Sequence, residues 1–426
     1  MNNLKYLRTN FVNILIASII PFLVWGPFFP DLIVSVSALF FLFYIWKNNK
    51  FYYLNNTPFV VFFLFCIISV ICSLNSDDVA TSIKSSFFYF RIGVFSCFIW
   101  YLIDKDKSIL TFFYYALILC FSALVVDGYF QYFTGKNLIG LEISGIRISS
   151  FFGDELIMGS YLSRLFPLLF ALFLVKEKKR FEMYFIGFLF ILIDVLIYMS
   201  AERSAFFALN LSTIFIIILI KEFQKFRLIT FILGIICITI LSFNSSKLFD
   251  RMFLSPAKDM GITKNSTHSF KSPTEMVIFT PMHDSHIRTA INMFKDKPIL
   301  GHGPKMFRIK CSDPKFSYGL WPCSTHPHNF SVQLLAETGI IGFLFLLSAF
   351  VYVVYTALRQ FKSIIFRQKR PLTDYQVCLL AGILITVWPL TPNGNFFNNW
   401  MMVAYSLPVG FYLQSIYSKK LIKKNS

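Results

Sequence analysis

The stretch Pro58-Phe-Val-Val-Phe-Phe-Leu-Phe-Cys-Ile-Ile-Ser-Val-Ile-Cys-Ser-Leu74 is a long apolar run that contains no charged side chain. Ser108–Val126 and Leu228–Phe243 repeat the pattern. A helix needs roughly 17–25 mostly apolar residues to cross a bilayer core of about 30 Å. A membrane β-barrel would instead require short strands of alternating polarity, and the runs do not alternate. These runs therefore predict a helical membrane protein.

The composition extends this prediction to the whole chain. Of its 426 residues, 56% are hydrophobic and only 15% are charged, whereas soluble domains are about a quarter charged. We predict an all-α, polytopic membrane protein of about twelve transmembrane helices, with one large loop between the ninth and tenth. The chain then divides into helices 1–9 (residues 1–243), the large loop (244–328), and helices 10–12 with a tail (329–426). The predicted spans are 11–29, 31–46, 58–74, 85–103, 108–126, 151–175, 181–199, 204–220, 228–243, 329–358, 377–393 and 398–417.

The basic residues are distributed unevenly, although the formal net charge is +18. They gather at both termini and in alternate loops, such as Lys176–Arg180 and Arg359–Arg370. The short loops of the other side hold only Lys84, Lys136, Arg147 and Arg203. Lys and Arg favour the cytoplasmic side, so this asymmetry predicts cytoplasmic termini and an extracytoplasmic large loop. The charge is explained by orientation in the membrane, and we expect no nucleic-acid partner.

Several ionisable residues fall inside or beside the predicted spans. Each costs roughly 2.5–3.5 kcal/mol on insertion scales, so such residues usually have a partner or a role. A cavity open to the extracytoplasmic side would explain the set; structural pairs, such as Arg91 with Asp194, are the alternative. Those in the outer half are Arg91, Asp154, Glu155, Asp194, Glu202, Arg203 and Glu337, and only Arg164 lies deeper.

The large loop changes character midway. Its first half is polar and weakly patterned, and we expect a mobile spacer there. In its second half, His286–Lys295 can form a short helix, and Pro298–Pro304 is rich in turn residues. Cys311 and Cys323 both lie in this half. An oxidising compartment would favour a disulfide between them, which would contribute on the order of 3 kcal/mol.

The most informative motif is Thr325-His-Pro-His-Asn-Phe-Ser-Val-Gln-Leu-Leu-Ala-Glu-Thr-Gly-Ile-Ile-Gly342. It resembles the signature of the bacterial O-antigen ligase and O-antigen polymerase superfamily, in which a His followed by Asn, Ser or Gln is separated by nine residues from a Gly-x-x-Gly. Phe343 stands where the ligase form often has Thr or Val. Three further stretches look like family segments: Asp127…Gln131…Gly135…Arg147-Ile-Ser-Ser-Phe-Phe-Gly153, Ser200-Ala-Glu-Arg-Ser-Ala205 and Arg288…Lys297-Pro-Ile-Leu-Gly-His-Gly303.

The resemblance implies a metal-independent, inverting glycosyltransferase without a cofactor, in the bacterial inner membrane with its active site on the periplasmic face. It would move a glycan from undecaprenyl pyrophosphate to a sugar hydroxyl of lipid A–core, amid membrane lipids. His328 would be the base, Arg203 and Arg288 would hold the pyrophosphate, and Arg147 would assist. The alternative is the polymerase that extends the growing lipid-linked glycan. Two further alternatives are a protein O-oligosaccharyltransferase and a lipid-linked sugar transporter.

The residues themselves support this chemistry. His328 lies where the loop enters the tenth span, and the partial positive charge of a helix N-terminus disfavours imidazolium. A neutral imidazole at an aqueous interface can take a proton from a hydroxyl, although His328 could equally serve only to cap the helix. Asn329, Gln333 and Glu337 follow at helical spacing and form one polar stripe. We expect Arg91, Asn329 and Glu337 to contact substrate.

A metal site is the competing use of the histidines. All six lie between residues 268 and 328, and His283, His286, His326 and His328 could supply ligands. The outer loops lack clusters of carboxylates, however, and arginines grip phosphate oxygens without a metal. We therefore predict no metal.

Overall fold

The computed structural model describes residues 2–177, 179–260 and 277–424, and this part of the chain is helical without a β-strand. The N-terminal helices are α1 (Asn2–Ala17), α2 (Ile19–Trp25), α3 (Phe28–Asn48), η1 (Phe51–Tyr53), α4 (Thr57–Leu74), α5 (Val79–Ser86), α6 (Phe90–Lys105) and α7 (Ser108–Thr134). The central helices are η2 (Ser150–Phe152), α8 (Met158–Val175), α9 (Arg180–Met199), α10 (Arg203–Leu219), α11 (Gln224–Asn244), α12 (Ser246–Phe249), η3 (Asp250–Leu254) and α13 (Ser255–Asp259). The last helices are α14 (Pro281–Asp296), α15 (Phe307–Lys310), α16 (Phe330–Ile365), α17 (Asp374–Val387) and α18 (Asn399–Lys424).

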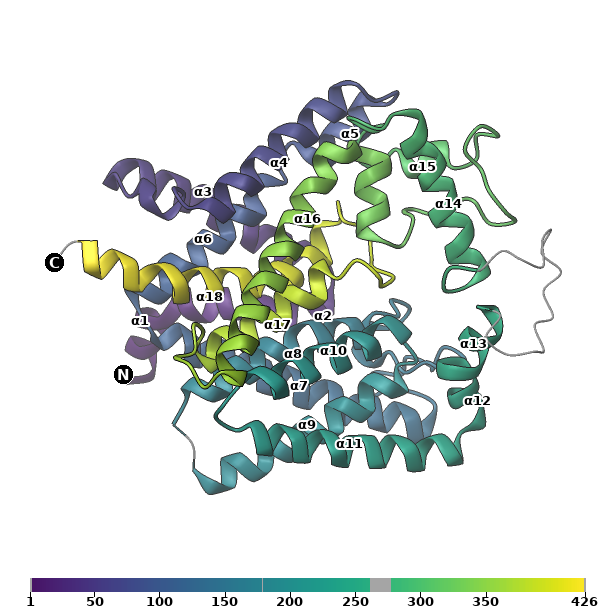
Figure 1. Ribbon diagram of the computed structural model, residues 1–426. Coiled ribbons are helices and arrows are strands. Elements are labelled where there is room, and N and C mark those ends of the chain that lie inside the picture. Colours follow the sequence, from purple (N-terminus) through teal and green to yellow (C-terminus); the bar gives the residue numbers. More distant parts are fainter. Residues whose placement is uncertain (1, 178, 261–276, 425–426) are drawn as a thin grey trace.

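The predicted all-α membrane class is confirmed. Eight of the predicted spans coincide, within the described residues, with stretches long and apolar enough to cross a bilayer. Three more correspond to shorter apolar helices at 10–25, 203–219 and 374–387, and α18 covers the last. Figure 1 shows both termini at one end of the bundle and α12 to α15 at the other. We call the latter end the loop face.

The sixth predicted span begins too early. Helix α8 starts at Met158, and Asp154 and Glu155 lie exposed in the preceding loop. Its start is fixed by the buried Glu202 carboxylate, which accepts hydrogen bonds from the N–H groups of Gly159 (2.6 Å) and Ser160 (3.0 Å). These are the amides that a helix start leaves without an intrahelical partner.

The predicted pair of Arg91 with Asp194 is wrong. Asp194 is bonded through both carboxylate oxygens to Arg227, at 2.9 and 3.0 Å, and Arg227 also donates to Thr213 at 2.7 Å. Arg227 falls just outside the predicted span 228–243, but it is fully buried in α11. Gly234 has no side chain to separate α11 from Asp194, so the two helices approach closely.

The first half of the large loop is partly helical, contrary to the prediction of a spacer. Leu248 and Met252 lie one turn apart on α12 and η3 and are buried, and the Phe253 ring packs near Tyr198 and Phe206. This apolar face holds residues 246–259 against the bundle. The remainder of the predicted spacer, residues 261–276, lies outside the described residues.

The second half of the loop forms a small core of its own. The predicted helix at 286–295 is confirmed as part of α14. Side chains of α14, α15 and the start of α16 pack together there around Met293, Phe307 and Ala336. Cys311, also in this core, is joined to Cys323 by a disulfide, with a Cα–Cα distance of 5.0 Å.

Helix α16 is not the continuous span that was predicted. Gly339 interrupts it with φ 64° and ψ −167°, a conformation almost confined to glycine. The short first segment, 330–338, stays with the loop face, and the long second segment runs on to Ile365 (Figure 1).

Candidate active site

His328 stands immediately before α16 in a left-handed backbone conformation, with φ 55°. The helix is capped by the next residue: the Asn329 side chain accepts a hydrogen bond from the N–H of Val332 at 3.1 Å. Non-glycine residues seldom adopt positive φ, and such strain concentrates at functional sites. The capping role is therefore performed by Asn329, and the His328 side chain is left for another purpose.

Three other histidines, from two segments, surround this position. The ring centroid of His328 lies 4.1 Å from that of His326 and 5.3 Å from those of His283 and His286. His283 and His286 lie on one face of α14, one turn apart. The start of α14 could have been recognised in the sequence from Thr280-Pro281. Thr280 caps the helix and Pro281 occupies its first turn, which is the usual pattern of a helix start.

All four imidazoles are held neutral. Burial first, and then the neighbouring histidines, lower the pKa of His328 to about 3. Burial likewise lowers the pKa of His326 and that of His283 to about 4 each, and it also lowers that of His286. Within the described ranges, no three His, Cys, Asp or Glu side chains are grouped as a metal ion requires. The cluster is thus a set of neutral bases and hydrogen-bonding groups.

A polar network fixes the backbone around His328. The N–H of Asn393 donates to the His328 carbonyl at 2.8 Å, and the Asn393 carbonyl faces His326 Nε2 at 3.3 Å. Because a carbonyl only accepts, His326 must carry its proton on Nε2. The Asn393 side chain accepts in turn from the buried Arg164 of α8 at 2.8 Å. The deepest predicted charge, Arg164, therefore supports the histidines from below. His328 Nε2 lies 3.2 Å from the Ser324 hydroxyl.

Three arginines gather at the turn between α9 and α10. Arg147 donates to the carbonyls of Leu156 (2.9 Å) and Ser200 (3.4 Å), and Arg203 donates to the carbonyl of Arg251 at 2.8 Å. Burial lowers the pKa of Arg147, and the charge of Arg251 acts in the same direction. Arg147 and Arg203 were predicted site residues, whereas Arg251 was missed because its segment showed no pattern.

The arginine group adjoins the histidine cluster. The charge of Arg203 is close enough to lower the pKa of His283. Carboxylates also act on this group: Glu202, which is already bonded to the start of α8, acts to raise the pKa of Arg147, and Asp259 and Asp250 act to raise that of Arg203. Three guanidinium groups thus lie beside the neutral imidazoles, and such cations can stabilise an anionic leaving group.

The loop that carries Arg147 is tied back to its own helix. Gln131, on the last turns of α7, accepts hydrogen bonds from the N–H groups of Ser149 (3.1 Å) and Ser150 (2.8 Å). Asp127 accepts from the N–H of Leu138 at 2.8 Å. The two polar residues noted in the sequence therefore place Arg147 and do not themselves face the arginine group.

Arg288 lies on α14, the helix of His283 and His286, and is bonded to its own helix. Its Nε donates to both carboxylate oxygens of Asp284, at 3.0 and 2.9 Å, and its guanidinium lies 5.1 Å from the Tyr318 ring centroid. The structure thus places Arg288 on the helix that carries His283 and His286, with Asp284 as its ion-pair partner.

The polar stripe of α16 connects the segments of the loop face. Asn329 donates to the carbonyl of Pro389 at 2.8 Å. Gln333 donates to Asn395 (2.8 Å) and to Glu337 (3.0 Å), and Glu337 accepts from the N–H of Phe307 at 3.1 Å. All three stripe residues are buried. Asn329 and Glu337, predicted to bind substrate, thus have the geometry of residues that position the surrounding loops.

The glycines of the motif make a backbone junction with the Pro298–Pro304 turn. Beside the break at Gly339, the turn amides of His302 and Gly303 donate to the carbonyls of Ala336 (3.0 Å) and Glu337 (2.8 Å). A Cβ at Gly339 would lie 2.1 Å from the Ile299 carbonyl oxygen. The two glycine-containing motifs are therefore the two sides of one close contact.

Arg91, the remaining predicted contact residue, is ion-paired with Asp31 of α3 and donates to Ser35 at 3.0 Å. Its partner Asp31 lines a cleft at the loop face, so Arg91 lies behind one wall of that cleft.

Part of this chain resembles a known protein family. Residues 186–347 match the family model described as O-antigen ligase. The match supports the resemblance of this chain to the O-antigen ligase superfamily. The matched stretch includes Arg203, Arg251, Arg288 and His328, whereas Arg91 and Arg147 precede it in the sequence. Members of this superfamily are glycosyltransferase-like membrane enzymes, consistent with the apolar helices described above. No curated protein matches the chain.

Proposed function

We propose that this protein is a metal-independent, inverting glycosyltransferase that uses a polyprenyl-pyrophosphate-linked glycan as donor. The observation that carries the proposal is the neighbourhood of His328. A half-buried, neutral imidazole lies in a cluster whose member His283 is affected by the charge of Arg203. A base for the acceptor hydroxyl and cations for the leaving group thus occupy adjoining positions.

In the proposed reaction, an acceptor hydroxyl donates its proton to His328 as its oxygen attacks the anomeric carbon of the donor. The bond between that carbon and the pyrophosphate oxygen breaks, and the anomeric configuration inverts. Arg203, Arg147 and Arg251 receive the charge that develops on the pyrophosphate. Arg288 would join them by exchanging the Asp284 carboxylate for a phosphate oxygen.

An apolar crevice supports a lipid-linked substrate. It has a volume of about 600 Å³ and lies between α4, α6, α16 and α18. Aromatic side chains line it, and one of them is Phe330, two residues after His328. A hydrocarbon chain in this crevice would hold its headgroup near the histidines. With the termini in the cytoplasm, as the positive charges favour, that headgroup lies on the periplasmic face of the bacterial inner membrane.

The base is tested by His328→Asn, because asparagine tolerates the left-handed backbone and cannot take the proton. We expect the variant to fold like wild type in detergent and to lose transfer by at least a hundredfold. Ser324→Ala, which removes the hydroxyl beside Nε2, should retain transfer to within about tenfold. Transfer by His328→Asn at the wild-type rate would contradict the assignment.

The acceptor distinguishes ligase from polymerase. Purified protein would be given lipid-linked donor with either lipid A–core or a second lipid-linked glycan, without a membrane gradient. We propose lipid A–core as the preferred acceptor, since the family description is that of the ligase. Product on the lipid-linked glycan alone would establish the polymerase, and no product with either acceptor would favour transport.

A further inference from the structure

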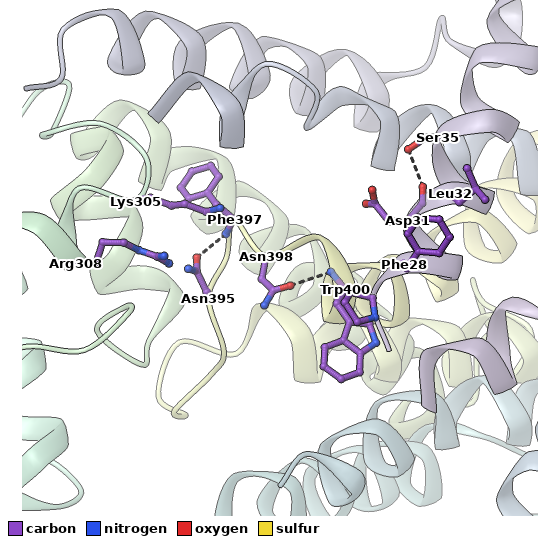
Figure 2. Close-up of a pocket in the computed structure, with 11 residues that line it drawn as sticks. Phe28, Asp31, Leu32, Ser35, Lys305, Arg308, Asn395, Phe397, Asn398 and Trp400 are labelled. Atoms are coloured by element: carbon purple, nitrogen blue, oxygen red, sulfur yellow. Dashed lines mark hydrogen bonds between the residues drawn. The ribbon is translucent and has the colours of Figure 1, made fainter. Parts of the chain in front are cut away.

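A cleft of about 650 Å³ lies at the loop face, apart from the arginine group. Figure 2 shows Lys305 and Arg308 at one end of it, Asp31, Ser35 and Phe28 at the other, and Asn395, Asn398 and Trp400 between. Its walls come from the α2–α3 turn, the segment around α15 and the loop before α18. These segments are distant in the sequence and meet only in the folded protein.

The cleft has an excess of positive charge. Among the described residues, neither Lys305 nor Arg308 forms an ion pair, and Arg308 is exposed. The carboxylate of Asp31 is already paired with Arg91. Lys305 adopts φ 63°, a strained conformation like that of His328. The fold thus holds two cations without an ion pair at this end of the cleft, and Glu337 is a carboxyl group that interacts electrostatically with both.

The cationic end of the cleft is next to the histidines. Arg308 donates to the carbonyl of Thr325 at 3.2 Å, one residue before His326, and its charge lowers the pKa of His326. Glu337 accepts a hydrogen bond from the N–H of Phe307, which fixes the short helix α15 on which Arg308 lies. A molecule bound to Arg308 would therefore reach the cluster that contains His328.

The other end of the cleft has the character of a membrane interface. Trp25, Phe28 and Phe29 around the α2–α3 turn are 81%, 67% and 44% exposed, and aromatic side chains favour the boundary between lipid and water. Trp400 and Phe28 offer flat faces for sugar rings, and Asn395 and Asn398 offer amides for hydroxyls. The cleft thus combines sugar-binding groups, cations and access from the lipid surface.

We propose that this cleft binds the acceptor, and that the acceptor is a lipid-anchored saccharide carrying phosphate or carboxylate. Lys305 and Arg308 hold its anionic group while the aromatic and amide side chains hold its sugars. This places the accepting hydroxyl toward His328, whereas the donor pyrophosphate occupies the group of Arg147, Arg203 and Arg251. The inference rests on the proposed glycosyltransferase function and assigns its second substrate to a separate cationic site.

The test uses the purified full-length protein and the variant Lys305→Asn/Arg308→Gln. Asparagine preserves the left-handed backbone at 305, and thermal unfolding in detergent checks the fold. Lys315→Gln is the matched control, because Lys315 is exposed, paired with Asp296 and absent from the cleft. The probes are a phosphorylated core oligosaccharide on lipid, the same lipid after phosphatase treatment, and a polyprenyl-pyrophosphate-linked glycan.

Binding without donor tests the cleft directly. We expect the double variant to bind the phosphorylated core lipid at least tenfold more weakly, and the phosphatase-treated lipid with unchanged affinity. Equal binding of the phosphorylated lipid by wild type and double variant would overturn the inference. If the polyprenyl-linked glycan alone shows the tenfold loss, the anionic acceptor is the growing chain and not the core.

Transfer assays separate this inference from the proposed function. We expect the double variant to raise the KM for the phosphorylated acceptor at least tenfold, with the donor KM and kcat within about twofold of wild type. An equal rise in the donor KM would overturn the assignment of the cleft to the acceptor. Absence of transfer by wild type, with acceptor binding still weakened in the variant, would refute the glycosyltransferase function and leave an anionic-saccharide site.

Discussion

The junction between the two glycine motifs gives the sharpest test of this fold. Substituting Gly339 by alanine should destabilise the protein far more than its single methyl group suggests. The φ of 64° and ψ of −167° at this position cost about 1–3 kcal/mol for any residue with a Cβ. The new Cβ would also lie 2.1 Å from the Ile299 carbonyl oxygen, a backbone atom that cannot turn aside.

Relief of this contact requires the Pro298–Pro304 turn to move away from α16. That movement breaks three backbone hydrogen bonds, donated by His302, Gly303 and Ile340 at 3.0, 2.8 and 2.9 Å. Each contributes about 0.5–1.5 kcal/mol. Together with the backbone strain, the free energy of unfolding should fall by roughly 3–7 kcal/mol. The same movement displaces α15, so transfer activity should fall as well.

Two other glycines separate the contribution of backbone strain from that of the close contact with Ile299. Gly140 has φ 89° but no atom within 4 Å of a built Cβ, and Gly394 has neither positive φ nor a close neighbour. Gly140→Ala should therefore cost about 1–2 kcal/mol and Gly394→Ala close to none. Unfolding in mixed detergent micelles, followed by tryptophan fluorescence, gives the three values. A Gly339→Ala variant no less stable than Gly140→Ala would refute the junction.

Three further predictions concern buried charge, the disulfide and pH. Asp194→Ala leaves the buried Arg227 unpaired and should cost about 3–5 kcal/mol, whereas Asp194→Leu/Arg227→Met should recover most of it in the same unfolding assay; equal loss in both would contradict the pairing. Replacing Cys311 and Cys323 by serine opens the ring closed by their disulfide, with a sequence separation of 12, and should lower the unfolding free energy by about 3 kcal/mol; reductant should then no longer affect stability. His328 can act as a base only while it is neutral, and burial and the neighbouring imidazoles lower its pKa to about 3. The value of kcat/KM should therefore not decline between pH 8 and pH 5. A decline in kcat/KM with an apparent pKa near 6.5 would instead indicate an unperturbed histidine.

Much of the molecule was predictable from local pattern. The helices follow from apolar runs because a bilayer requires each spanning segment to satisfy its own backbone. The region of the proposed site was indicated by the motif that begins at Thr325, and shorter stretches indicated Arg147, Arg203 and Arg288 as candidates. The errors were at boundaries, as at Met158, where capping by Glu202 comes from another segment. The break at Gly339 was also missed, because its cause is a turn forty residues earlier in the chain.

The sequence by itself thus determined the class of the protein, its helices and the identity of the histidine that heads α16. Only the tertiary structure decided which charges are paired and which remain unpaired. It joined Asp194 to Arg227, brought Arg251 to the arginine group, and placed Lys305 and Arg308 beside a cleft. The physical reason is one of range. Helix formation in a membrane depends on neighbours along the chain, whereas ion pairs, close backbone contacts and clustered imidazoles depend on segments that meet only when the bundle packs.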